Sequence, residues 1–376
     1  MAVRSLTAES LSREEAYELY QEIQQNPGHY AKKAAAVRDK HYLSLTVSKN
    51  LFVPLTYWCR NDCLYCQFRR TSGKPFLSEE EVQQLVNQGR TMKCPEILFT
   101  MGEKPEDHFS NARQWLDTHG YSSTIDYLVQ CCKIALEAGL LPHSNPGVLT
   151  YSELARLANV NASMGLMLET YSKRLQLPGQ AHAKSPTKNP EKRLDFIRNA
   201  GKLKVPFTTG LLIGIGETSE ELVDGILAIH EVNERYSHIQ EVIIQNVVMP
   251  ETTSRAPNLQ SCPPEKLFSA IILARLLLDP EISIQVPPNL NKGFEEQLIT
   301  IGINDWGGIS QVTIDQVNPR APWPDYKHLQ EISEKYGFNL LERLPVYPRF
   351  INSHWLRPKV FPIAKKWQQK LENQLQ

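Results

Sequence analysis

The chain has 376 residues with 41 Lys and Arg against 41 Asp and Glu, so its formal net charge is zero. A neutral chain sets up no field that would gather a polyanion, and we expect no nucleic-acid partner. At 41% hydrophobic and 22% charged residues, the composition is typical of a globular protein with a sizeable core. No run approaches the ~20 apolar residues of a membrane span, and Met1–Tyr20 lacks a secretory apolar segment. We therefore expect no membrane partner and a cytoplasmic location.

In chain order, two helical patterns come first. Ser12 and Glu15 form a capping box that predicts a helix, and Tyr30–Lys40 has the pattern of a second. A β-rich run, Ser44–Leu55, follows, and the next helix opens at Ser78 with Glu81. Later helices open at Thr150 with Glu153 and at Thr218 with Glu221. Further strands are predicted at Glu96–Thr100, Leu141–Ser144, Asn161–Leu168, Pro206–Ile213, Glu241–Val248, Ser283–Val286 and Gly302–Asp305, with helices between them, including one long helix that ends at Leu136.

Eight strands alternating with helices favour a (β/α)8 barrel, an α/β fold, over an open doubly wound sheet, which more often has six strands. We predict an N-terminal helical segment (1–43), a barrel (44–330) and a C-terminal extension (331–376). In such a barrel, the residues that follow each strand converge on one mouth.

Three cysteines stand close together directly after the first predicted strand: Cys59, Cys63 and Cys66. Thiolates in one short loop can reach a single metal centre, and soft sulfur ligands select zinc, copper(I) or iron–sulfur clusters. A structural zinc site needs four ligands, and the chain has no second CxxC or HxxxH pair. Three thiolates without a fourth favour a 4Fe-4S cluster with one iron open to another ligand. The remaining cysteines, Cys94, Cys131, Cys132 and Cys262, are expected to be buried structural thiols in a reducing compartment.

The CxxxCxxC spacing, with aromatic Tyr65 before the last cysteine, resembles the radical S-adenosylmethionine (SAM) superfamily. The resemblance implies a TIM-type barrel in which the open iron chelates the amino and carboxylate groups of SAM. One electron from the cluster then cleaves SAM to methionine and a 5'-deoxyadenosyl radical. The protein has to hold the substrate beside that radical and exclude water.

Other strand ends carry candidate SAM contacts. Glu169 ends the fourth predicted strand, and a carboxylate there suits ribose hydroxyls. The superfamily resemblance adds Gly102 and Glu103 for the SAM amino group, although Met101 replaces the first glycine of the usual motif, and Arg193 for the SAM carboxylate. It also implies that Gly214, Ile215 and Gly216 pack on adenine. Without the resemblance, Gly102–Glu103 reads as a plain turn, Arg193 as a solvated helix residue and 214–216 as a tight βα turn.

Longer runs resemble one family, the CofG subunits of 7,8-didemethyl-8-hydroxy-5-deazariboflavin (FO) synthase. These runs are Leu98–Asp107, Leu140–Thr150, Asn161–Thr170, Phe207–Thr218 and Asn304–Thr313. The resemblance implies a radical SAM lyase that converts 5-amino-5-(4-hydroxybenzyl)-6-(D-ribitylimino)-5,6-dihydrouracil to FO and releases ammonia, 5'-deoxyadenosine and methionine. It also implies a CofH-type companion subunit that makes this adduct and a reductant such as ferredoxin or flavodoxin.

So polar a substrate agrees with the neutral hydrogen-bonding residues at the remaining strand ends. These are His143, Asn145, Gln245, Asn246, Asn289, Asn291 and Asp305. His143 is a candidate proton shuttle, with ordinary packing as the alternative. The long loop Tyr171–Pro190 is a candidate lid over the mouth.

Two rival functions stay open on the sequence. One is another radical SAM enzyme, of the biotin-synthase-like or menaquinone-pathway kind, with the same cluster and a different substrate. The other is a non-catalytic metal-binding or redox-sensing barrel, which would use the thiols of Cys59, Cys63 and Cys66 without cleaving SAM.

Overall fold

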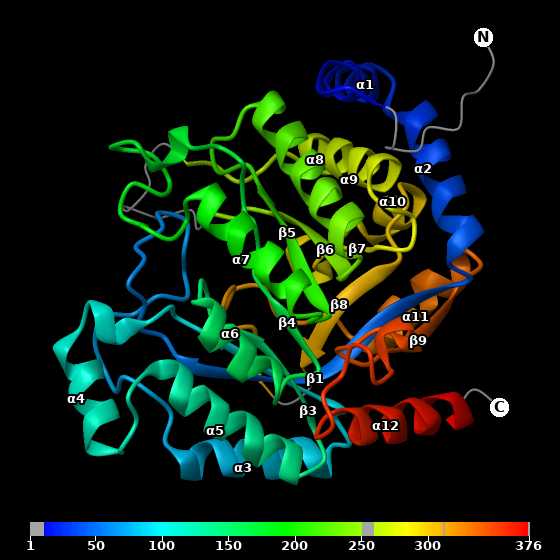
Figure 1. The fold of residues 1–376 in the computed structure, drawn as a ribbon. Coiled ribbons are helices and arrows are strands. Elements are labelled where there is room, and N and C mark those ends of the chain that lie inside the picture. The colour runs from blue at the N-terminus through cyan, green and yellow to red at the C-terminus, as the bar shows by residue number, and fades with distance from the viewer. Residues whose placement is uncertain (1–10, 250–258, 311–312, 375–376) are drawn as a thin grey trace.

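Eight parallel strands close into a barrel surrounded by helices, as predicted (Figure 1). The structure, a computed structural model, describes residues 11–249, 259–310 and 313–374. The sheet order β2-β3-β4-β5-β6-β7-β8-β1 is closed by pairing of β1 with β2. The strands are β1 Ser44–Thr56, β2 Glu96–Met101, β3 Leu141–Asn145, β4 Ser163–Gly165, β5 Phe207–Ile213, β6 Ile239–Asn246, β7 Ser283–Gln285 and β8 Asp305–Ser310.

Helices cover the outside of the barrel, and four of them begin with the capping boxes that the sequence indicates. Before the barrel lie α1 Arg13–Gln25 and α2 Pro27–His41. Around it lie α3 Glu79–Thr91, α4 Ser110–Thr118, α5 Thr124–Glu137, α6 Tyr151–Ala158, α7 Pro190–Lys202, α8 Ser219–Tyr236, α9 Pro264–Leu277 and α10 Glu295–Thr300. Capping boxes start α1, α3, α6 and α8, where a Ser or Thr side chain accepts from the backbone N–H of the Glu three residues on.

Three predicted elements differ from the structure. The last strand was predicted at Gly302–Asp305 but begins at Asp305, because Gly302 has φ +100° and turns the chain after α10. The true β8 contains two glycines, which have low β propensity, and was missed for that reason. The long helix predicted before β3 is two helices, α4 and α5, which a turn at Gly120 with φ +78° separates. The fourth strand is only three residues long.

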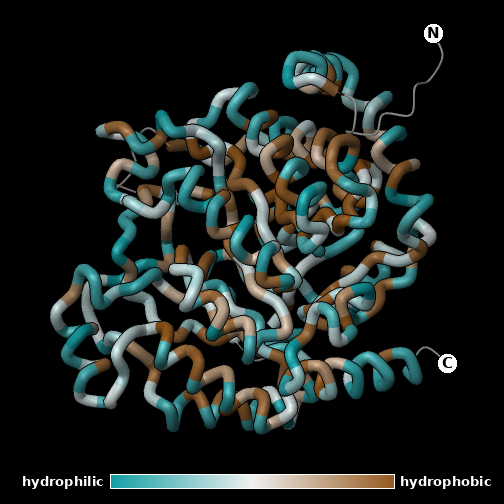
Figure 2. The backbone as a smooth tube through the Cα atoms, in the orientation of Figure 1, coloured by the Kyte–Doolittle hydropathy of each residue, from teal (hydrophilic) through white to brown (hydrophobic). Residues whose placement is uncertain are grey.

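The most apolar run of the sequence, Ala270–Leu278, belongs to α9, which is buried over most of its surface. Figure 2 shows the hydrophobic colour concentrated in the helices and strands of the interior. Arg275, which interrupts that run, is fully enclosed and donates to the backbone oxygens of Gly302 and Ile282. None of the described helices is long and apolar enough to cross a membrane.

The C-terminal part of the chain joins the barrel. After α11 Tyr326–Lys335, the strand β9 Asn339–Glu342 pairs in parallel with the first residues of β1. A second apolar cluster follows, in which Phe350 and Val360 pack with Leu141 at the start of β3. The chain ends in α12 Phe361–Gln374. This segment therefore covers the amino-terminal end of the barrel, opposite the predicted mouth.

Candidate active site

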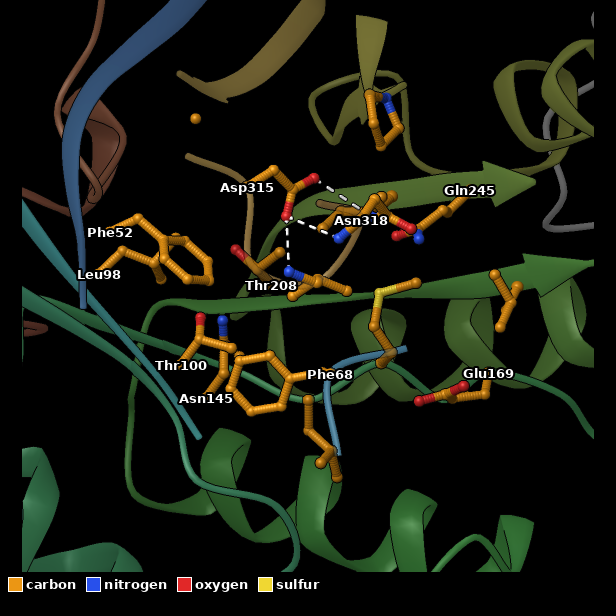
Figure 3. Close-up of a pocket in the computed structure, with 18 of the residues that line it drawn as sticks. Phe52, Phe68, Leu98, Thr100, Asn145, Glu169, Thr208, Gln245, Asp315 and Asn318 are labelled. Atoms are coloured by element: carbon orange, nitrogen blue, oxygen red, sulfur yellow. Dashed lines mark hydrogen bonds between the residues drawn. The ribbon is translucent and has the colours of Figure 1, made fainter. Parts of the chain in front are cut away.

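A cavity of about 420 Å³ extends into the barrel, and its wall includes residues from every strand of the barrel (Figure 3). At the carboxyl ends of the strands its wall includes Cys59, Cys63, Cys66, Glu103 and Glu169. Phe52, Phe68 and Leu98 lie on its wall near Thr100 and Asn145, so apolar and polar side chains face the same space. The predicted convergence of strand ends on one mouth is confirmed.

The three clustered cysteines lie in the loop after β1 and all reach the cavity wall. Cys59 Sγ accepts the backbone N–H groups of Asn61 at 3.4 Å and Glu103 at 3.2 Å. Cys63 Sγ accepts the Ser185 hydroxyl at 3.2 Å. Burial raises the pKa of both thiols, that of Cys63 to about 11. A metal that binds here would have to displace the thiol protons.

These thiols fit the iron–sulfur cluster that their spacing predicts. Among the described residues no three His, Cys, Asp or Glu side chains converge on a single ion site. Each thiolate of a cluster binds its own iron, so a shared point is not required. The donors at Cys59 and Cys63 are those that tune a cluster's potential. Cys59, Cys63 and Cys66 are therefore the residues that would hold it.

Gly102 and Glu103, which follow β2, contact the loop that carries Cys59, Cys63 and Cys66, here called the cysteine loop. A Cβ on Gly102 would lie 2.0 Å from the backbone oxygen of Trp58, so only glycine lets the two segments pass. The Glu103 carboxylate is buried and accepts from Arg60 at 2.6 Å and from Asn61 at 3.3 Å. Both residues line the cavity, and Glu103 already holds a cationic partner.

Glu169 is the centre of a buried ionic cluster that contacts the cysteine loop through Tyr65. Lys188 pairs with its carboxylate, the Tyr65 hydroxyl donates to it, and Arg193 Nη2 lies 3.5 Å from Oε1. Burial raises the pKa of this carboxyl, but the charges of Lys188 and Arg193 outweigh burial and lower it to about 2. Glu169 is thus an anion on the cavity wall, and its contact with the ribose hydroxyls stays a prediction.

Arg193 is buried, which makes the solvated-helix alternative wrong. It lies on α7, and its Nε donates to the backbone oxygen of Met167 at 2.6 Å. The guanidinium also lines the cavity. Tyr65 is partly buried and its hydroxyl lies 2.9 Å from His182 Nε2; desolvation of the hydroxyl raises its pKa well above the ordinary value.

Gly214, Ile215 and Gly216 are not on the cavity wall that the described residues form. The Glu217 carboxylate accepts from the backbone N–H groups of Gly214 at 2.8 Å and Ile215 at 2.9 Å. A Cβ on Gly214 would lie 2.7 Å from Cβ of Cys262. The segment therefore has the geometry of a tight βα turn, and its contact with adenine stays a prediction.

Among the predicted substrate residues, His143, Asn145, Gln245, Asn246 and Asn289 line the cavity. Burial lowers the pKa of His143 to about 4, so its imidazole is neutral at pH 7; Nδ1 lies 2.7 Å from Ser163 Oγ. Its role as a proton shuttle stays a prediction.

Asn291 and Asp305 are not brought to the wall. Asn291 donates to Asn246 Oδ1 and to a backbone oxygen, and Asp305 pairs with Arg343. Both side chains are taken up by internal bonds near the cavity.

The sequence analysis missed the polar residues that line the cavity toward the amino ends of the strands. These are Ser48, Asn50, Glu96, Thr208, Glu241, Gln285 and Arg343. One signal was present: polar side chains recur at every second position of β1, at Thr46, Ser48 and Asn50. Because alternate residues of a strand share a face, this pattern indicates a polar barrel interior.

The loop 171–189 packs against the cysteine loop. The backbone N–H groups of Asp62 and Leu64 donate to the oxygens of Lys184 and Ala181, each at 3.0 Å. Leu175, Ala181 and His182 are buried. The loop thus supports the cysteine loop directly, and closure as a lid stays a prediction.

The barrel and the thiol-lined mouth define a radical SAM protein. A family model described as the Radical SAM superfamily matches residues 53–227. Among solved structures, the FeFe-hydrogenase maturase HydG from Carboxydothermus hydrogenoformans aligns over 95% of this chain and 80% of its own, with TM-score 0.67 and 20% identity. Methylornithine synthase (PylB) aligns over 89% and 91%, with TM-score 0.61 and 18% identity. At these identities the two structures establish the fold.

Relatives of assigned function show to which family within this class the chain belongs. A 7,8-didemethyl-8-hydroxy-5-deazariboflavin synthase of Methanopyrus kandleri is 47% identical over 326 residues, which cover 86% of this chain and 97% of the relative. The synthase of the same name from Methanocaldococcus jannaschii is 48% identical over 319 residues, 84% of this chain and 87% of the relative. The chain belongs to the 7,8-didemethyl-8-hydroxy-5-deazariboflavin synthase family.

Proposed function

We propose that this protein is the CofG-type enzyme of FO synthesis, which closes the hydroxybenzyl–ribityliminouracil adduct to FO with loss of ammonia. The observation that carries the proposal is one cavity whose mouth holds three thiols and two predicted SAM-binding groups, Glu103 and Glu169, and whose depth is polar. Family membership supports the substrate class.

The thiols of Cys59, Cys63 and Cys66 would hold a 4Fe-4S cluster. When bound, this cluster supplies the one electron that cleaves SAM to methionine and the 5'-deoxyadenosyl radical. The reductant is a low-potential carrier such as ferredoxin or flavodoxin. Backbone N–H groups and the Ser185 hydroxyl donate to the sulfurs and hold them in place.

The anionic and cationic groups of the wall orient SAM. Glu103 accepts from the amino group, Glu169 accepts from the ribose hydroxyls and Arg193 pairs with the carboxylate. For Glu169 this requires an exchange of partners, because Lys188 and Tyr65 occupy its oxygens without SAM. Phe52, Phe68 and Leu98 keep water from the reacting carbon.

The adduct binds in the remaining cavity, beside His143 and Asn145. The neutral imidazole of His143 accepts a proton from the ring that becomes aromatic, with Ser163 fixing its orientation. A CofH-type companion supplies the adduct, by release or by direct transfer.

The test is conversion of the adduct by the anaerobically reconstituted, reduced protein. SAM and a CofH-type enzyme that makes the adduct are supplied. We expect FO, detected by its fluorescence, to form together with an equal amount of 5'-deoxyadenosine. A protein that cleaves SAM but forms no FO would be another radical SAM enzyme. A protein that contains one zinc and no labile sulfide would be a metal-binding barrel, and either result overturns the proposal.

A further inference from the structure

The end of the cavity farthest from the thiols is built from polar side chains. We name it the deep end and define it by Asn50, Glu96, Glu241, Gln285 and Trp306, which all line the cavity. Glu96 is the first residue of β2 and the Cα partner of Asn50 on β1. The interior of a (β/α)8 barrel is ordinarily filled by bulky branched side chains, so this composition calls for a physical explanation.

Glycines on neighbouring strands make room for the deep-end amides. A Cβ on Gly308 would lie 2.1 Å from Asn50 Nδ2, and one on Gly307 would lie 2.1 Å from Gln285 Nε2. Each amide therefore lies across the backbone of β8, where any other residue would displace it. The sequence of β8 keeps these amides at the cavity wall.

Two deep-end groups have no hydrogen-bond partner among the described residues, Asn50 Oδ1 and Trp306 Nε1. Both residues are only 1% exposed. The hydrogen bond that the described residues give to Glu96 comes from Ser48 to Oε2, which leaves Oε1 for another donor. A buried polar group without a partner is costly, so these groups indicate a bound ligand.

The charges at the deep end select against an anion. Glu96, Glu241 and Asp305 lie around the guanidinium of Arg343, which pairs with Glu241 at 2.7 Å. Burial raises the pKa of Glu96, and that of Glu241 to about 7. A phosphate or carboxylate would be repelled here, whereas a neutral hydrogen-bond donor would be attracted.

Hydroxyl groups of the protein already donate hydrogen bonds to two of these carboxylates. Ser48 donates to Glu96, and Thr208 donates to Glu241 at 2.9 Å. The free groups at the deep end are two acceptors, Asn50 Oδ1 and Glu96 Oε1, and one donor, Trp306 Nε1. A ligand hydroxyl both donates and accepts, so a chain of hydroxyls satisfies all three.

We propose that the deep end binds the polyhydroxy chain of the substrate, with Asn50, Glu96 and Trp306 as its hydrogen-bonding residues. This inference rests on the proposed function, whose adduct and product both carry a ribityl chain. It orients the substrate with its ring system toward the thiols and its hydroxyl chain toward the amino ends of the strands. The deep end is thereby a specificity site that lies apart from the SAM contacts.

The test compares two fluorescent probes, FO and its analogue with a methyl group in place of ribityl, in anaerobic titrations of the reconstituted enzyme. Wild type is expected to bind FO at least tenfold more tightly than the methyl analogue. Glu96→Gln keeps the shape of the site and removes the carboxylate acceptor, and Trp306→Phe removes the Nε1 donor together with part of the buried ring. Each variant is expected to reduce the ratio of the two affinities about fivefold. Trp323→Phe is the matched control: Trp323 lines the same cavity, but its Nε1 donates to the Thr313 oxygen at 3.0 Å, so the ratio should stay unchanged.

Equal binding of the two probes by wild type would overturn the inference. The inference would also be overturned if both deep-end variants kept the wild-type ratio of FO affinity to methyl-analogue affinity. In that case the unpaired groups would bind water and not the substrate. Uncoupled SAM cleavage without substrate checks that each variant folds and carries its cluster. Formation of FO from the adduct by wild type is measured in parallel, so that loss of the proposed function is distinguished from loss of this site.

Discussion

Glu169 shows how one residue's backbone sets the charge of the site. Its φ is +69°, a left-handed conformation that residues other than glycine rarely adopt, in the segment that follows β4. That turn lets the carboxylate meet Lys188, Tyr65 and Arg193 inside the barrel mouth. Such strain is retained where the surrounding contacts require it, often at functional sites.

We predict that Glu169→Gln weakens SAM binding about tenfold or more. The amide carries no charge, so Lys188 and Arg193 lose their anion, and the ribose hydroxyls lose a charged acceptor. The measurement is the SAM concentration that half-perturbs the spectrum of the reduced cluster. Glu191→Gln is the control, because Glu191 is half-exposed and pairs with Lys173 on the outside. An unchanged SAM dependence for Glu169→Gln would exclude Glu169 from SAM binding.

A second residue-scale prediction concerns His238, which is buried beside Phe207. Its Nδ1 atom has no hydrogen-bond partner among the described residues. Burial lowers its pKa to about 3. Between pH 6.5 and 3 the unfolded chain therefore binds a proton that the folded one does not, and stability falls as the pH falls.

The loss of unfolding free energy approaches about 1.4 kcal/mol for each pH unit below 6.5. His238→Gln does not titrate, so the Tm of wild type should fall more steeply than that of the variant between pH 7.5 and 5.5. Parallel curves would show that His238 takes up its proton at the same pH in the folded and the unfolded chain, and would contradict a lowered pKa.

At the level of single residues, the sequence predicted some site groups and missed others for physical reasons. Cys59, Cys63, Cys66 and Glu169 lie in the segments that follow β1 and β4, and the βα topology alone brings such segments together. Asn50 and Glu96 lie within strands, and their exposure to a cavity depends on which interior positions are left unfilled. That depends on packing between distant strands, such as Asn50 over Gly308, which local patterns do not contain.

At the scale of elements, the loop 171–189 has a clear structural task. It pairs with the cysteine loop through backbone hydrogen bonds and places Ser185 at 3.2 Å from Cys63 Sγ. The same loop supplies Lys188 to Glu169. One segment thus couples the predicted cluster ligands to the predicted SAM contacts.

We predict that Ser185→Ala makes the cluster harder to reduce. A hydrogen bond to a thiolate sulfur stabilises the more negative, reduced state, so its removal lowers the reduction potential. Potentiometric titration followed by EPR measures the change, with Ser152→Ala on the exposed start of α6 as the control. A potential equal to that of wild type would show that Ser185 acts only in packing.

The elements themselves were predictable where local signals are strong. The capping boxes of α1, α3, α6 and α8 stand where the sequence indicates, because a cap is a local hydrogen bond. β8 was misplaced because its glycines serve the side chains of neighbouring strands, a long-range requirement. β9 was missed altogether, because its pairing with β1 joins segments from opposite ends of the chain.

At the scale of the whole molecule, Arg343 joins the C-terminal segment to the barrel. It pairs with Asp305 on β8 through Nε at 2.5 Å and Nη2 at 2.9 Å, and with Glu241 on β6. Tyr347, four residues on, donates to Asp305 at 3.0 Å. The segment thus closes the end of the barrel opposite the mouth with a buried ionic network.

Replacement of Arg343 by Met is expected to destabilise the protein by about 3–5 kcal/mol, because two buried carboxylates lose their shared cation. Arg198→Met is the control: it removes a pair with Asp195 on the exposed face of α7, which is worth at most about 1 kcal/mol. Denaturant unfolding under anaerobic conditions measures both. Equal effects of the two variants would contradict the closure role of Arg343.

The most direct test of the account is the EPR spectrum of the reduced, anaerobically reconstituted protein with and without SAM. The account predicts a 4Fe-4S signal that SAM changes in wild type, and no such cluster in a variant with Cys59, Cys63 and Cys66 all replaced by Ala. A cluster signal that SAM leaves unchanged would mean that no iron is open to it and would contradict the account.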